Sequence, residues 1–256
     1  MLYLSPFKIS MFLECPRRYK FHYIDGLAEK FKKPKPHFTM GENVHRTLKE
    51  FYDSLPPQKR TKENLENLLR EIWRQNRAGF RDKEEEKKFG LLALSMLNKF
   101  YQEIDVTKKP LLLEKSYKIN LGKEIILQGK IDRVDLEADG LVIIDYKTGK
   151  EPEDNDYLQL IIYSIIISQK INKQIKEASY WYLKNNCKVS INPTEKDLEN
   201  GILEIKSLAE IIRNEKKFKP NINKFCNWCE YLSICPMKEE IEKNEKYNDL
   251  FLEEPF

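Results

Sequence analysis

Apolar residues recur every three to four positions through the first hundred residues, and this spacing predicts amphipathic helices. The first covers "SPFKISMFLECPRRYKFHYIDG", where Gly26 is expected to end it. A second is expected over "MGENVHRTLKEFYDSL", just before two prolines. Two more, both heavily charged, are predicted at 62–78 and 84–104. We therefore expect the N-terminal part of the chain to be helical.

The middle of the chain changes to the alternating pattern of β-strands. Three segments joined by glycine turns, 111–122, 124–140 and 140–149, predict an antiparallel meander. The nearly continuous apolar segment 154–170 is ambiguous by period, but its length and its "DND" start favour a buried helix. The strands "KEASYWYLK" and "VSI" and a helix at 194–216 follow. Because a strand reached through a crossover helix can join the same sheet, we expect a mixed α/β fold.

Composition limits the possible classes of protein. The 256 residues are 41% hydrophobic and 34% charged, which suits a folded domain with a core and excludes disorder of the whole chain. The net charge of +4 and the pI of about 8.6 do not by themselves indicate nucleic-acid binding, so any DNA affinity must come from local patches. The longest apolar segment, 157–168, is shorter than the ~20 residues of a membrane span, and the N-terminus lacks a signal-peptide pattern. We expect a cytoplasmic protein.

The strand "GLVIIDYKTGK" ends in an acid, an aromatic residue, a base and a glycine turn. Because side chains alternate along a strand, Leu141, Ile143, Asp145 and Lys147 share one face. At the rim of a sheet, the carboxylate can bind a divalent cation, while the ammonium holds the attacking water or neutralises charge on a phosphate. An isolated "DxK" is more often a surface ion pair, so the evidence for chemistry depends on neighbouring segments.

Residues in other segments strengthen the case for a site. Asp132 in "GKIDRVD" lies on a largely apolar face, where a lone carboxylate is costly unless it is paired or binds a cation; oxygen ligands favour magnesium or manganese. Gln159 and Tyr163, four positions apart, share one face of the predicted helix. His45 alone favours a structural role, although imidazole can join carboxylates as a ligand. Glu114 is expected to pair with a lysine, or alternatively to orient another group.

Five cysteines at uneven spacing indicate metal ligands or buried thiols rather than a disulfide framework. Cys226, Cys229 and Cys235 follow the pattern C-x2-C-x5-C, and Cys15 near the other end is a possible fourth ligand. Four thiolates can hold structural zinc or an iron–sulfur cluster. Paired CxxC motifs would favour zinc, whereas one ligand here is remote. Cys187 has no partner in this arrangement.

Together these motifs resemble the RecB-like branch of the PD-(D/E)XK nuclease superfamily, including its iron–sulfur members among AddB-type and CRISPR-associated RecB-like exonucleases. The resemblance is carried by "GENVH", "GKIDRVD", "DYKTG" and "QLIIY" in the family's order, and by the four cysteines. It implies an α/β, restriction-endonuclease-like core with a central mixed sheet flanked by helices. We expect one nuclease domain over 1–256, with a helical insertion at 56–105, a catalytic core at 110–192 and an iron–sulfur clamp formed by Cys15 and 226–235.

The resemblance also implies roles for individual residues. It implies a Mg²⁺ or Mn²⁺ site formed by His45, Asp132, Asp145 and the main-chain carbonyl of Tyr146. The implied catalytic residues are Asp132, Asp145, Lys147, Gln159 and Tyr163. A 4Fe-4S cluster would be bound by Cys15, Cys226, Cys229 and Cys235, joining the two ends of the chain.

The implied function is metal-dependent hydrolysis of DNA, as an exonuclease on single-stranded ends in repair or recombination. One alternative is a nuclease that processes DNA for CRISPR adaptation. Another is a non-catalytic iron–sulfur module that binds DNA or assists a helicase, although the motif set is complete. Arg17 and Arg18, with the lysines at 32, 33 and 35, are candidate phosphate contacts. The chain has no phosphate-binding loop of an ATPase, so any unwinding requires a partner such as a helicase.

Overall fold

The computed structural model describes residues 1–151 and 156–243, which divide into two compact units. Unit 1 contains residues 1–33 and 120–127 together with the described residues from 203 onward. Unit 2 contains residues 34–119 and the described residues of 128–202. The predicted nuclease motifs therefore fall in unit 2, and the four predicted cluster cysteines fall in unit 1.

The sheet of unit 2 is mixed. Its strands are β2 (Leu112–Asn120), β3 (Ile125–Glu137), β4 (Gly140–Lys147), β5 (Ile175–Tyr182) and β6 (Cys187–Ile191). The β3–β4 and β5–β6 pairs are antiparallel, β4 and β5 run parallel, and β2 also pairs with β3. The three consecutive strands, and the later strand that joins the sheet in parallel after a helix, are confirmed as predicted.

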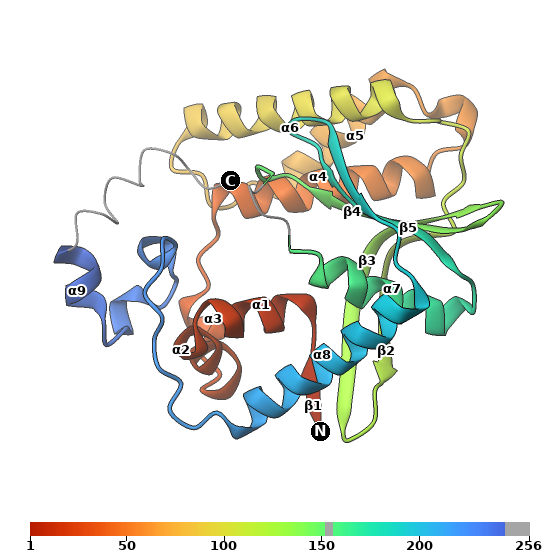
Figure 1. Cartoon of the computed structure of the whole chain (residues 1–256). Helices are drawn as coiled ribbons and strands as arrows, with labels where there is room; N and C mark the ends of the chain where they lie inside the picture. Colours follow the sequence, from red (N-terminus) through yellow and green to blue (C-terminus); the bar gives the residue numbers. More distant parts are fainter. Residues whose placement is uncertain (152–155, 244–256) are drawn as a thin grey trace. The chain divides into compact units, whose positions relative to one another are not determined.

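Helices cover both faces of this sheet. They are α4 (Pro36–Asp53), α5 (Lys62–Gln75), α6 (Lys83–Glu103) and α7 (Leu158–Ile171), with a short 3₁₀ turn η2 (Pro57–Lys59). Figure 1 shows α4, α5 and α6 together on one side of β4 and β5, with α7 on the other. Val142, Ile144 and Tyr146 share a buried cluster with the first three helices. By strand alternation Leu141 and Ile143 face α7, which packs on β4 and β5. The prediction of an α/β fold with a mixed sheet flanked by helices is confirmed.

Helix α7 is buried on most of its surface, as its continuous apolar sequence predicts. Leu160, Ile162 and Ile166 are each 0% exposed. The helix begins at Leu158, whose amide donates to Asp156 Oδ1 at 2.8 Å. The first two residues of the predicted "DND" start, at 154 and 155, lie outside the described residues.

Unit 1 begins with a short strand that the sequence pattern did not predict. Strand β1 (Leu2–Leu4) pairs in parallel with Ile125–Leu127 of β3. The expected single helix is instead α1 (Pro6–Glu14), α2 (Pro16–Tyr19) and the π-helical turn η1 (Lys20–Ile24). It breaks at Cys15, which is extended, because the residue before a proline disfavours the helical conformation. The chain then turns at Gly26, whose φ is +66°.

The remaining elements of the described chain are mostly short. They are α3 (Ala28–Phe31), α8 (Glu195–Asn214), the 3₁₀ turns η3 (Cys226–Trp228) and η4 (Leu232–Ile234), and α9 (Lys238–Lys243). The predicted helix at 194–216 is confirmed as α8. The regular elements within the cysteine segment 226–235 are the two 3₁₀ turns η3 and η4. Among residues 1–151 and 156–243, no helix has both the length and the apolar character needed to cross a membrane.

Candidate metal and catalytic site

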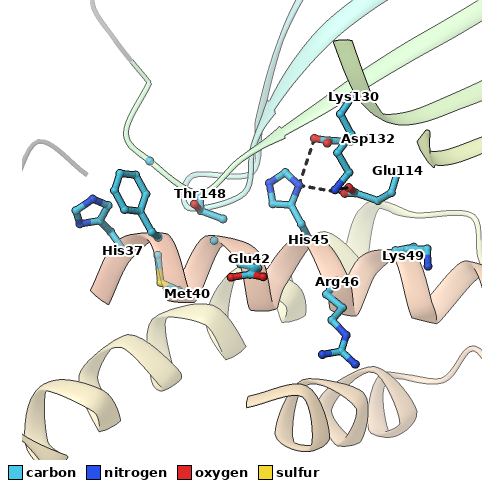
Figure 2. Close-up of a pocket in the computed structure, with 13 residues that line it drawn as sticks. His37, Met40, Glu42, His45, Arg46, Lys49, Glu114, Lys130, Asp132 and Thr148 are labelled. Carbon is cyan, nitrogen blue, oxygen red and sulfur yellow. Dashed lines mark hydrogen bonds and ion pairs between the residues drawn. The ribbon is translucent and has the colours of Figure 1, made fainter. Parts of the chain in front are cut away.

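Three side chains from three different elements of unit 2 converge on one point. His45 projects from α4, Glu114 from β2 and Asp132 from β3, as Figure 2 shows. His45 Nδ1 lies 3.3 Å from Glu114 Oε1 and 3.4 Å from Asp132 Oδ2. One possible ligand atom from each residue lies within 4.8 Å of the others. We call these three residues the ligand group.

Glu114 reaches the ligand group through an unusual backbone conformation. Its φ is +49°, in the left-handed region that non-glycine residues seldom adopt, and such a residue interrupts the regular alternation of a strand. Its carboxylate also forms an ion pair with Lys130 on β3. Both sequence interpretations of Glu114 therefore apply, since it pairs with a lysine and contacts His45. Sequence reasoning did not select Lys130, although its i, i+2 relation to Asp132 on one strand could have identified it.

Four other predicted residues form a second, hydrogen-bonded group. Lys147 Nζ lies 2.6 Å from Asp145 Oδ2 and donates to Gln159 Oε1 at 2.9 Å. Gln159 Nε2 donates to Asp145 Oδ1 at 2.8 Å and to the Tyr163 hydroxyl at 2.9 Å. The acid and the base share one face of β4, while Gln159 and Tyr163 are one turn apart on α7. We call these four residues the lysine group.

The two groups meet at the ends of β3 and β4. Arg133 on β3 pairs with Ile144 on β4. Asp132 and Asp145 are the next residues beyond this pair, so they lie next to each other on the two adjacent strands. The Tyr146 amide donates to Asp132 Oδ2 at 2.9 Å, which fixes the buried carboxylate. The backbone of Tyr146 therefore lies at the site, while its ring packs in the core on the α4 side of the sheet.

Charges in the site shift the pKa values of two residues. Burial alone would lower the pKa of His45, but the adjacent Asp132 carboxylate, helped by Glu114, raises it to about 10. Burial raises the pKa of Asp145 to about 6; the Lys147 ammonium opposes this rise and the Asp132 charge adds to it. The metal-free protein therefore holds a protonated His45 at neutral pH.

Two glycines of the motifs allow these elements to approach closely. A Cβ atom on Gly41 would lie 3.2 Å from Thr148 Oγ1, in the turn that follows β4. A Cβ atom on Gly129 would lie 2.9 Å from Tyr163 Cε1, closer than side-chain carbons normally come. Glycine at these positions lets α4 approach the end of β4 and lets Tyr163 pack directly on β3.

The donor atoms of this site fit a divalent cation. Glu114, Asp132 and Asp145 offer carboxylate oxygens and His45 offers a nitrogen, a mixture that suits Mg²⁺ or Mn²⁺. Asp145 Oδ2 is buried and forms an ion pair with the Lys147 ammonium at 2.6 Å. The ligand group lines a pocket of about 640 Å³.

The cysteines that are predicted to bind a cluster do not converge as closely as the residues of the ligand group. All four are free thiols of intermediate exposure: Cys15, Cys226, Cys229 and Cys235. The main-chain N–H of Asn221 donates to Cys15 Sγ at 3.5 Å, and the main-chain N–H of Asn223 donates to Cys226 Sγ at 3.3 Å. Burial raises the pKa of Cys229 to about 11. In the part of the chain that the structure describes, no cysteine belongs to a group of three possible ligand atoms within 4.8 Å. Cys187 lies in unit 2, on β6.

Comparison with known proteins adds independent findings. The sequence profile of the PD-(D/E)XK nuclease superfamily matches residues 3–236. No curated protein matches the sequence. A structure from Eubacterium rectale, named "Putative exonuclease", is 12% identical and covers 90% of this chain and 87% of its own, with a TM-score of 0.51. The structure of SSO0001 is 13% identical and covers 92% and 86%, with a TM-score of 0.43. At these identities the likeness to the E. rectale protein is one of fold.

Proposed function

The chain belongs to the PD-(D/E)XK nuclease superfamily, and from this premise we propose that it is a Mg²⁺- or Mn²⁺-dependent deoxyribonuclease that hydrolyses phosphodiester bonds. The observation that carries the proposal is the junction of the ligand group and the lysine group at Asp132 and Asp145. We propose exonuclease action on single-stranded DNA ends, in DNA repair or recombination in the cytoplasm. The name of the E. rectale protein supports an exonuclease.

The metal would be held by His45, Asp132, Asp145 and the main-chain carbonyl of Tyr146. Glu114 joins this set because its carboxylate lies 3.3 Å from the His45 imidazole. A bound divalent cation stabilises the negative charge that develops on the phosphate and its leaving oxygen. His45 must release its proton to act as a ligand, since only the neutral imidazole has a free lone pair.

Lys147 would act directly on the substrate. An ammonium has three N–H donors, and the Asp145 carboxylate and Gln159 Oε1 engage two of them. The third can donate to a phosphate oxygen or hold the attacking water, which stabilises the transition state. Gln159 fixes both Asp145 and Lys147, and Tyr163 holds the Gln159 amide in this orientation.

The four cysteines would hold a 4Fe-4S cluster that stabilises the fold. Cys15 and the C-x2-C-x5-C segment all lie in unit 1. Burial raises the pKa of the Cys226 thiol, and the neighbouring Cys15 and Cys235 thiols add to this rise. Amide N–H groups directed at the sulfurs favour the thiolate form that binds iron. A cluster spaces its sulfur ligands further apart than a single zinc ion does. In this proposal the chain is one nuclease domain with a helical insertion at 56–105, a core at 110–192 and the cysteine clamp.

Cleavage of end-labelled DNA tests this function. Wild type, Lys147→Ala and the exposed control Lys173→Ala are compared on single-stranded and duplex DNA with Mg²⁺, Mn²⁺ or a chelator. We expect metal-dependent cutting that falls by about 100-fold or more in Lys147→Ala, the usual size of a positioned catalytic group, and stays unchanged in the control. Folded wild type that binds DNA but never cuts it would instead support the non-catalytic, helicase-partner function. Strict dependence on a CRISPR integrase would support a role in adaptation.

A further inference from the structure

The pocket beside the ligand group has two chemically different ends. Phe38, Glu42, His45 and Lys49 follow a spacing of three to four residues along α4, so they lie on one face of that helix. Figure 2 shows His37 at one end and Lys49 at the other, with His45 between them. An aromatic end and a basic end therefore lie on opposite sides of the proposed reaction centre.

The aromatic end presents a ring to solvent. Phe38 is 59% exposed although it lines a pocket, and its ring centroid lies 4.3 Å from that of His37. Burial and the nearby Lys35 charge lower the pKa of His37 to about 4, so its ring is uncharged at neutral pH. The Lys35 ammonium lies 5.9 Å from the Phe38 ring. The two rings meet at an interplanar angle of 61°, so an unpaired base can stack on the exposed Phe38 ring but not on both rings at once.

The basic end suits a polyanion. The lining of the pocket has three basic residues, Arg46, Lys49 and Lys130, and three acidic residues, Glu42, Glu114 and Asp132. A divalent cation bound to the acidic ligand group would leave the lining with a net positive charge. Among the described residues, Lys49 has loose contacts with acids on its own helix, at 3.6 Å to Glu50 and 3.9 Å to Asp53, and exposed ion pairs of this kind are weak. The ammonium can therefore turn to a phosphate at little cost.

Resting on the proposed nuclease function, we propose that this pocket selects single-stranded DNA. An unpaired base stacks on the exposed Phe38 ring, which His37 contacts at an interplanar angle of 61°, on one side of the scissile phosphate, and Arg46 and Lys49 contact backbone phosphates on the other. From Phe38 to Lys49 the helix extends about 16 Å at 1.5 Å per residue, enough for a few nucleotides. A duplex keeps its base faces inside the stack, so it cannot use the aromatic end, whereas both forms can use the basic end.

Fluorescence anisotropy with labelled oligothymidylate and a mixed-sequence duplex tests the proposal. All proteins carry Lys147→Ala, which is expected to slow cutting by about 100-fold or more, and Mg²⁺ is present. We expect Phe38→Ala to weaken single-strand binding roughly 10-fold, within the range for loss of one aromatic stacking contact, and to leave duplex binding unchanged. Phe38→Trp should retain binding. The matched control is Leu91→Ala, which removes a side chain that is 57% exposed on α6, outside the pocket.

A separate prediction concerns the residues at the basic end of the pocket. Arg46→Ala with Lys49→Ala should weaken both DNA forms and reduce the dependence of binding on salt, by about 0.7 in log–log slope for each lost contact to a single strand. Equal single-strand binding by Phe38→Ala and Leu91→Ala would overturn the base-stacking proposal, even if wild type cuts DNA. Selective loss of single-strand binding in Phe38→Ala would support it, even if wild type never cuts DNA and the nuclease function fails.

Discussion

The two sets of possible metal ligands are held by different kinds of structure. His45, Glu114 and Asp132 project from a long helix and two strands, and their ligand atoms lie within 4.8 Å without any ion. Cys15 instead lies at the break between two helices, and Cys226, Cys229 and Cys235 lie at the edges of short 3₁₀ turns. The packed sheet of unit 2 assembles the first set by itself, whereas the second depends on irregular backbone.

This difference separates two roles for a metal. Where packing already positions the ligands, the free energy of binding an ion remains available for substrate and catalysis. Where turns position them, binding of the metal contributes to folding. We therefore expect metal loss at the carboxylates to remove activity and leave the fold, and metal loss at the cysteines to destabilise unit 1.

The largest expected effect is at the cysteines. Cys226→Ser should abolish binding of the proposed iron–sulfur cluster and destabilise unit 1, because metal binding contributes on the order of 10 kcal/mol to folding in domains that depend on it. Iron content, visible absorption and thermal unfolding measure this, with Cys187→Ser as the matched control on β6. A Cys226→Ser protein with wild-type stability would remove the contrast between the two ligand sets. Zinc in place of iron would preserve the difference between the two ligand sets and identify a different metal at the cysteines.

The next effect is the pH dependence of metal binding at the carboxylates. The pKa of His45, about 10, lies above its ordinary value of 6.5, so the metal-free protein gains stability from the protonated ring. That stability is fully present below pH 6.5 and is lost as the pH rises to about 10. Because a ligand must be neutral, Mn²⁺ affinity should rise about tenfold per pH unit between pH 7 and 8.

Calorimetry in buffers of different ionisation enthalpy measures the proton directly. At pH 7.5 we expect close to one proton released for each Mn²⁺ bound, so the apparent enthalpy should vary with the buffer. An enthalpy that is the same in every buffer would show that His45 is already neutral or does not bind the ion.

Glu114 tests whether the ligand group extends beyond the predicted residues. Glu114→Gln removes a charge beside His45 and should lower Mn²⁺ affinity 10- to 100-fold, the usual range for groups that orient metal ligands. Glu42→Gln is the matched control, because Glu42 lines the same pocket but lies outside the ligand group. Equal Mn²⁺ affinities for the two variants would show that Glu114 pairs with Lys130 but does not contribute to metal binding.

The last expected effect concerns packing between the two groups. Gly129→Ala places a methyl group 2.9 Å from the Tyr163 ring and should destabilise the protein by about 1–3 kcal/mol, as overpacking does. Gly149→Ala is the control, since a Cβ atom there meets nothing within 4 Å. Chemical denaturation measures both variants. A neutral Gly129→Ala would show that β3 and α7 are not held in close contact.

The sequence predicted the parts of the site that depend on local periodicity. The shared face of Asp145 and Lys147 follows from strand alternation, and that of Gln159 and Tyr163 follows from one helical turn. It did not predict the contact between Glu114 and His45, because a φ of +49° departs from strand geometry and the partner comes from a distant helix.

In the fold, too, the sequence predicted features that depend on local periodicity and missed those that depend on long-range pairing. Long periodic segments such as α6 and α7 were identified within a few residues of their ends. Strand β1 has three residues, too few for a pattern, and its pairing with β3 joins positions more than 120 apart in sequence. The break at Cys15 could have been recognised from Pro16, which the helical spacing of the surrounding apolar residues concealed.

The position of bound Mn²⁺ tests the central claim most directly. Anomalous diffraction from crystals of the wild-type protein soaked in Mn²⁺ would locate the ion without any assumption about activity. We predict a peak within the pocket, coordinated by His45, Glu114, Asp132 and Asp145, and no peak there in Asp132→Ala crystals. A strong peak elsewhere in the protein, with this site empty in the wild type, would contradict a metal-dependent nuclease centre at the ends of β3 and β4.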